Sequence, residues 1–140
     1  MAITQTFTNS FKSQVLQGDQ DLTADTLKMA LYTSSASLGA STTAYSATNE
    51  VTGNGYTAGG QTITGVTIAT SASGVVYLSF NTVSWPGSTF TARGALIYNS
   101  SKSNSSVAVL DFGMDQTCNN QIFAVTLPPN NFSSAIFRFS

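Results

Sequence analysis

The sequence predicts a mainly β fold in which two antiparallel sheets form a β-sandwich, with one short helix near the N-terminus. Three observations support this prediction. Helical spacing of apolar residues stops at Gly18, alternating spacing follows, and clusters of Gly, Pro, Asn and Ser separate the alternating segments. The length of 140 residues suits a single domain, residues 1–140, with one hydrophobic core.

The first 25 residues are predicted to be a helix and turn segment. Phe7, Phe11 and Val15 are four residues apart and fall on one helical face, with Leu16 at its edge, which predicts a helix over 8–17. The polar residue at position 8 or 9 is suited to cap the start of this helix, and Gly18 is a natural stop. The helical face of Phe7 and Phe11 packs either on the sandwich or against another chain.

Seven segments after this helix have the alternation of β-strands. In the first of them Leu27, Met29 and Leu31 face one way, and Lys28 and Tyr32 face the other. Short strands at regular spacing favour a sandwich, but periodicity does not separate a jelly-roll order from an immunoglobulin-like order. The predicted strands are 27–33, 61–69, 75–80, 91–98, 107–112, 122–127 and 135–139.

Residues 34–60 are predicted to form a long loop, in which Tyr45, Val51 and Tyr56 are the only sizeable apolar anchors. Loops of this length inside a domain are usually functional or packed by their own side chains. The stretch 53–60 is rich in glycine, but it lacks the lysine of a phosphate-binding loop and no helical pattern follows it. We therefore interpret its glycines as positions of positive φ.

Composition excludes several classes of function. Only 8% of the residues are charged, compared with about 25% in an ordinary domain. The net charge of −1 leaves no basic surface for nucleic acid, and the absence of histidine removes the commonest general base and metal ligand. Cys118 has no second cysteine for a disulfide or a zinc site. No apolar run approaches the roughly 18 residues of a membrane span, and the N-terminus has no secretory pattern, so we expect cytoplasmic synthesis.

The carboxylates of the chain predict no catalytic or metal site. Asp19, Asp21 and Asp25 alternate as in some calcium loops, but the glycine and distal glutamate of such a loop are missing, so we interpret them as turn residues. Asp111 and Asp115 have the chemistry of a glycosidase pair, yet no cluster of Trp and Tyr accompanies them. We predict no enzyme activity, no cofactor and no metal.

The conspicuous aromatic and basic residues are candidates for an interface with another chain. Arg93 lies in a strand of small apolar residues, where a charge must be paired or exposed. It binds either an acid of its own chain, Asp111 or Glu50, or a carboxylate of another chain. Trp85 is either an anchor at the core edge or an interface hot spot. The interface candidates are Phe7, Phe11, Tyr56, Trp85 and Arg93.

Five sequence blocks, in a fixed order over nearly the whole chain, carry a resemblance to a known family. They are Phe11-Lys12, Leu16-Gln17-Gly18, and residues 25–33, 50–60 and 90–98. In these blocks the sequence resembles a family of small virion proteins of tailed bacteriophages, the capsid decoration or cement proteins. The resemblance implies a jelly-roll-like β-sandwich bound outside an icosahedral shell, with the major capsid protein as its partner and no catalytic residues.

Two functions follow as expectations. The first is a cement protein on the capsid surface of the virion, made in the bacterial cytoplasm and binding neither nucleic acid nor membrane. A β surface with so few protective charges also favours a homo-oligomer, a dimer or trimer. The alternative is a tail or fibre-associated binding module that contacts a bacterial surface glycan.

Overall fold

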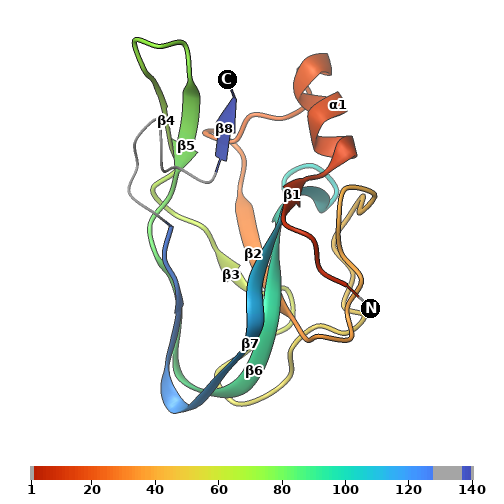
Figure 1. Cartoon of the computed structure of the whole chain (residues 1–140), viewed down its shortest axis with the longest axis vertical. Coiled ribbons are helices and arrows are strands. Elements are labelled where there is room, and N and C mark those ends of the chain that lie inside the picture. Colours follow the sequence, from red (N-terminus) through yellow and green to blue (C-terminus); the bar gives the residue numbers. More distant parts are fainter. Residues whose placement is uncertain (1, 128–136, 140) are drawn as a thin grey trace.

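The computed structural model describes residues 2–127 and 137–139 and contains two antiparallel sheets with one short helix (Figure 1). One sheet has the strand order β1-β7-β6-β2-β3, and the other has the order β4-β5-β8. This confirms the predicted mainly β fold with two antiparallel sheets, whereas the jelly-roll order stays a prediction. The strands are β1 Thr6–Phe7, β2 Leu27–Tyr32, β3 Gln61–Thr62, β4 Thr67–Thr70, β5 Val76–Ser79, β6 Val83–Asn99, β7 Ser105–Val125 and β8 Phe137–Phe139.

The predicted N-terminal helix is confirmed as α1, Asn9–Gln17. Thr8 caps its start, because the Thr8 Oγ1 accepts a hydrogen bond of 3.3 Å from the Phe11 N–H. Gly18 ends the helix in the left-handed conformation, with a φ of 80°. Phe11 is buried in the core, but Val15 is 38% exposed. Only the first half of the predicted apolar face is therefore buried.

A long hairpin of β6 and β7 forms the frame of the molecule, and its paired strands bend at the lower end of the view in Figure 1. The prediction of separate strands at 107–112 and 122–127 is wrong, because the polar residues between them continue the ladder with β6. The strand predicted at 91–98 likewise begins earlier, at Val83.

Bulges bend this hairpin. Pro86 and Gly87 of β6 lie opposite Ile122 alone, and Asn120 of β7 has no residue opposite it. Gly87 and Asn120 have positive φ values of 59° and 50°. A bulge bends and twists its strand, and it is one of the few places in a sheet that accept proline. Trp85 and Pro86 therefore mark a bend inside a strand, whereas their sequence suggests the end of one.

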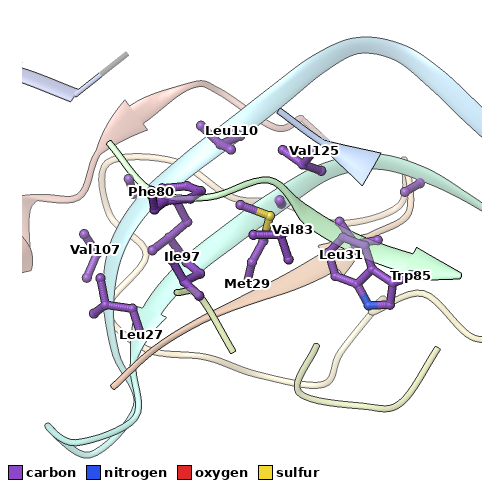
Figure 2. Close-up of a cluster of buried hydrophobic side chains, with 14 of the residues drawn as sticks. Leu27, Met29, Leu31, Phe80, Val83, Trp85, Ile97, Val107, Leu110 and Val125 are labelled. Atoms are coloured by element: carbon purple, nitrogen blue, oxygen red, sulfur yellow. The ribbon is translucent and has the colours of Figure 1, made fainter. Parts of the chain in front are cut away.

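The main core contains residues of both sheets (Figure 2). It continues to the start of β6 and the end of β7, which contribute Trp85 and Val125. Leu27, Met29 and Leu31 point into it from β2, as the alternation predicts, and Ile97 meets them from β6. Trp85 lies at one end of the cluster and is 0% exposed. Each fully buried side chain of this size contributes about 1.5–3 kcal/mol through the apolar surface removed from water.

The opposite face of β2 is buried as well, under the segments that precede and follow the strand. Ala30 and Tyr32 join Leu96, Tyr98 and Val109 in a second, smaller cluster. The residues that cover it are Ile3 and Ala36, with Leu38 and Tyr45 partly buried beside them. Loop 34–60 is thus packed by its own side chains against the outer face of the five-stranded sheet.

Of two further strand predictions, one is wrong and one lies partly outside the described residues. The segment 61–69 is not one strand, because β3 and β4 belong to different sheets. The chain changes sheet near Gly65, which has a φ of 69° and packs so closely on Asn81 that a Cβ atom would lie 2.5 Å from the Asn81 side chain. Residues 135 and 136 of the strand predicted at 135–139 lie outside the described residues. The sequence does not predict β1, since a strand of two residues shows no periodicity.

Candidate functional site

Four of the five interface candidates are aromatic residues that pack in two pairs. Phe7 stacks on Phe11 with ring centroids 5.4 Å apart, and Tyr56 stacks on Trp85 at 6.1 Å. Phe11 and Trp85 are 1% and 0% exposed, so their side chains pack in the core of their own chain. Phe7 and Tyr56 are partly buried against the same core. In this conformation, neither Phe11 nor Trp85 offers a surface to another chain.

Arg93 binds an acid of its own chain, which is one of the two alternatives that the sequence left open. Its Nε donates to the Asp111 Oδ1 at 3.2 Å, and the two side chains are 33% and 27% exposed. The same oxygen accepts a hydrogen bond of 2.9 Å from the Gly113 N–H. The Gly113 hydrogen bond first, and Arg93 second, hold the pKa of Asp111 below its usual value. The ion pair closes a bulge in which residues 112–115 of β7 lie opposite Arg93 alone.

A buried carboxylate organises loop 34–60. Glu50 is 8% exposed and forms a β-bridge with Tyr32 at the end of β2. The Tyr45 hydroxyl donates to its Oε2 at 2.7 Å, whereas the Tyr56 hydroxyl and the Gly59 N–H donate to its Oε1 at 2.6 and 2.7 Å. No described cation forms an ion pair with Glu50. The Tyr45, Tyr56 and Gly59 donors to its carboxylate are all neutral, and hydrogen bonds of this kind make a buried charge tolerable.

The tyrosines around Glu50 also connect the loop to the sheet. The Leu31 N–H donates to the Tyr56 hydroxyl at 2.9 Å, so this side chain takes the place of a neighbouring strand at the edge of β2. The Tyr98 hydroxyl donates to the Gly59 carbonyl at 2.7 Å, and its ring stacks on Tyr45 at 4.8 Å. We call this group the Glu50–tyrosine cluster: Glu50, Tyr32, Tyr45, Tyr56 and Tyr98.

The glycines of the loop allow its main chain to pack directly on the strands. Gly53, Gly55, Gly59 and Gly60 all have positive φ values, as the sequence predicts. A Cβ atom at Gly55 would lie 2.5 Å from the Ser88 Oγ, and one at Gly60 would overlap the carbonyl group of the β2 backbone. Glycine is therefore required here both for its conformation and for the close approach.

The Glu50–tyrosine cluster is built to hold a conformation. Burial raises the pKa of Tyr32, Tyr45, Tyr56 and Tyr98, and the nearby charge of Glu50 raises each of them further. These tyrosines consequently stay neutral donors over the ordinary pH range. The carboxylate oxygens already accept three hydrogen bonds in a buried position, which leaves little capacity for a substrate.

The aspartates after α1 lie in a turn, in agreement with their interpretation from the sequence. The Asp21 carboxylate accepts hydrogen bonds from the hydroxyl and the N–H of Thr23, and these lower the pKa of Asp21. The Asp25 carboxylate accepts a hydrogen bond of 2.7 Å from the buried amide of Asn99. Within residues 2–127 and 137–139, no group of three or more side chains is placed to hold a metal ion.

Sequence reasoning missed the exposed apolar side chains. Leu16 is 90% exposed, Ile122 is 67%, Met114 is 63% and Ile68 is 51%. The sequence places Leu16 at the edge of the face of Phe7, Phe11 and Val15, but the structure leaves it exposed. Met114 lies in the bulge 112–115 of β7, and Ile122 lies opposite the Pro86–Gly87 bulge of β6. Both bulges depend on a strand pairing that the sequence does not display.

An apolar groove lies between α1 and the three-stranded sheet. It has a volume of about 340 Å³, and Val15 and Ile68 contribute exposed apolar surface to it. Its other apolar lining residues are Phe11, Leu22, Val76, Leu78 and Phe137. The groove and Leu16 are apolar surface that the sequence does not predict.

Comparison with known proteins finds no matching family model, no similar curated protein and no similar solved structure. In the part of the chain that the structure describes, no helix is long and apolar enough to cross a membrane.

Proposed function

We propose that this chain is a structural virion protein of a tailed bacteriophage, a decoration protein that binds the outside of the capsid and stabilises the shell. The observation that carries the proposal is the exposure of Leu16, Met114 and Ile122 on a chain with only 8% charged residues. Exposed apolar side chains on a surface with few charges are suited to contact another protein. The resemblance of five sequence blocks to decoration proteins supplies the kind of partner, the major capsid protein.

The energetics of such a role require modest affinity at many equivalent sites. Each exposed Leu, Ile or Met that becomes buried on docking contributes about 1.5–3 kcal/mol, from which the cost of association is subtracted. A protein that binds the assembled lattice but not free subunits stabilises the lattice by mass action at every site. Association of decoration subunits into a dimer or trimer would add avidity to this effect.

The copy number per virion tests the proposal directly. Quantitative mass spectrometry of purified particles gives the ratio of this chain to the major capsid protein. We expect a ratio close to that of a regular lattice site, which means hundreds of copies in each virion. A handful of copies would contradict a decoration role and favour the tail or fibre-associated module that contacts a surface glycan.

Surface variants test which side chains make the contact. We expect Leu16→Ser, Met114→Gln and Ile122→Thr to weaken binding to empty shells by about ten-fold for each lost contact of 1.4 kcal/mol. Their melting temperatures should stay close to that of the wild type, since the altered side chains are exposed. Gln17→Ser and Ala124→Thr are matched controls at exposed neighbouring positions. Shell binding that is unchanged by all three apolar variants would contradict the proposed contact surface.

A further inference from the structure

We propose that Asn54 is a site of spontaneous deamidation, a covalent modification that alters the junction between loop 34–60 and β6. Asn54 is followed by Gly55, and both residues are exposed. Among the described residues, neither the Asn54 side-chain amide nor the Gly55 N–H makes a hydrogen bond. In deamidation the Gly55 backbone nitrogen attacks the Asn54 side-chain amide carbon, so both reacting groups are free. Glycine has no side chain that would hinder this attack.

The reaction needs only water. The Gly55 backbone nitrogen attacks the Asn54 Cγ, the new N–Cγ bond closes a succinimide ring, and the Cγ–Nδ2 bond breaks. Ammonia leaves with the proton that the Gly55 nitrogen loses. Water then opens the ring at one of its two carbonyl groups, which yields either aspartate or isoaspartate. One water is consumed, one ammonia is released, and nothing is oxidised or reduced.

Asn99, Asn104 and Asn119 lack this combination, because the N–H that follows each of them already has an acceptor. The Ser100 N–H donates to the Thr26 carbonyl, the Ser105 N–H to the Lys102 carbonyl, and the Asn120 N–H to the Thr89 Oγ1. These bonds protect Asn99, Asn104 and Asn119. Asn99 is protected further, since it is 0% exposed and its amide donates to Gln20 and Asp25.

The modification has a structural consequence at this position. The Thr89 N–H of β6 donates to the Asn54 carbonyl at 3.0 Å, and the two residues form a β-bridge. Gly53 and Gly55 on either side pack directly on Thr89 and Ser88 of β6. Isoaspartate inserts an additional main-chain carbon between these two close contacts, so the bridge to Thr89 cannot be kept in its present form. Either product also changes the net charge from −1 to −2.

Peptide mapping of the aged protein tests the proposal. The folded full-length chain is incubated in warm, slightly alkaline buffer, and samples are followed by isoelectric focusing and mass spectrometry with isoaspartate detection. We expect an acidic form whose mass change maps to Asn54, with conversion at least about ten-fold faster there than at Asn99, which requires local opening to react. Amide exchange at Thr89 should be faster in the isoaspartate form than in the unmodified protein.

Two variants sharpen this experiment. Asn54→Gln keeps an amide at the exposed position but needs a larger ring for the same attack, so the acidic form should no longer accumulate. Asn104→Gln is the matched control and should leave its accumulation unchanged. Conversion at Asn104 or Asn119 that is as fast as at Asn54 in the folded wild type would overturn the proposal, and so would an unmodified Asn54 after the other sites have reacted.

Discussion

Two carboxylates of this chain each hold an irregular segment in place, and they do so by opposite means. Glu50 is 8% exposed, forms no ion pair with a described residue, and is held by two tyrosine hydroxyls and one backbone N–H. Asp111 is 27% exposed and pairs with Arg93. The first carboxylate anchors loop 34–60 to the sheet, whereas the second closes a bulge of four residues in β7.

The difference shows how a chain with few charges can use a buried one. Removing a partner of a buried charge leaves groups that water cannot solvate, so the donors and the acceptor depend strongly on each other. A partly exposed ion pair is solvated in either state, and its loss costs little. The Glu50–tyrosine cluster should therefore control stability, and the Arg93–Asp111 pair should adjust local structure only.

Replacement of the buried carboxylate should have the largest effect. In Glu50→Gln one oxygen becomes an amide nitrogen, which presents hydrogen atoms to a tyrosine hydroxyl or to the Gly59 N–H. We expect a loss of about 3 kcal/mol in the free energy of unfolding, since donors are left buried without an acceptor. Urea denaturation measures this loss. A change below the effect of Arg93→Ala would show that the cluster does not organise the loop.

Removal of single hydroxyls should divide this effect. Tyr56→Phe deletes the donor to Glu50 and the acceptor of the Leu31 N–H, so we expect a cost of about 2 kcal/mol. Tyr45→Phe deletes only the donor to Glu50 and should cost about 1 kcal/mol. The double variant measures the coupling between the two hydroxyls through the shared carboxylate. Equal costs for both single variants would contradict the strand-like role of the Tyr56 hydroxyl.

The sequence predicts the anchor residues of loop 34–60 but not the contacts between them. Glu50 is the only glutamate of the chain, and Tyr45, Val51 and Tyr56 are visible as anchors of the loop. The spacing of these residues does not say that both hydroxyls meet one carboxylate, because that contact depends on the positive φ values of the surrounding glycines. Tyr98 lies 39 positions after Gly59 in the sequence and reaches it only through the pairing of β2 with β6.

Alkaline pH should destabilise the protein through the tyrosines of the Glu50–tyrosine cluster. The folded-state pKa of Tyr32 is raised above its unfolded value of about 10, so its contribution is complete below about pH 10 and is lost as the pH rises further. Through Tyr32, which is 1% exposed, each unit of pH in that range should lower the free energy of unfolding by about 1.4 kcal/mol. Tyr45, Tyr56 and Tyr98 act in the same direction. Spectroscopic titration in which these tyrosines ionise at ordinary values would contradict the buried cluster.

The edges of the sheets show where reasoning from composition fell short. Few charges suggest unprotected edges and hence a homo-oligomer, which stays a prediction. In the described residues, however, the outer edge of β7 is interrupted by the bulges at 112–115 and at Asn120, and β1 and β3 are only two residues long. Bulges and short edge strands limit pairing between molecules without any charge. Composition cannot display them, because they arise from the register of β6 on β7.

The smallest effect is expected at the exposed ion pair. Arg93→Ala should lower the free energy of unfolding by about 1 kcal/mol or less, because both side chains are partly exposed and the Gly113 N–H still binds Asp111. The pKa of Asp111 is lowered in the folded state, so its stabilising contribution is present above the unfolded value of about 3.9 and is lost as the pH falls through the folded value. The variant and the wild type should therefore differ at neutral pH and converge in acid. Arg93→Lys, which keeps the charge without the guanidinium geometry, is the matched control. A cost of Arg93→Ala as large as that of Glu50→Gln would contradict this comparison, because it would mean that the bulge depends on its ion pair as strongly as loop 34–60 depends on Glu50.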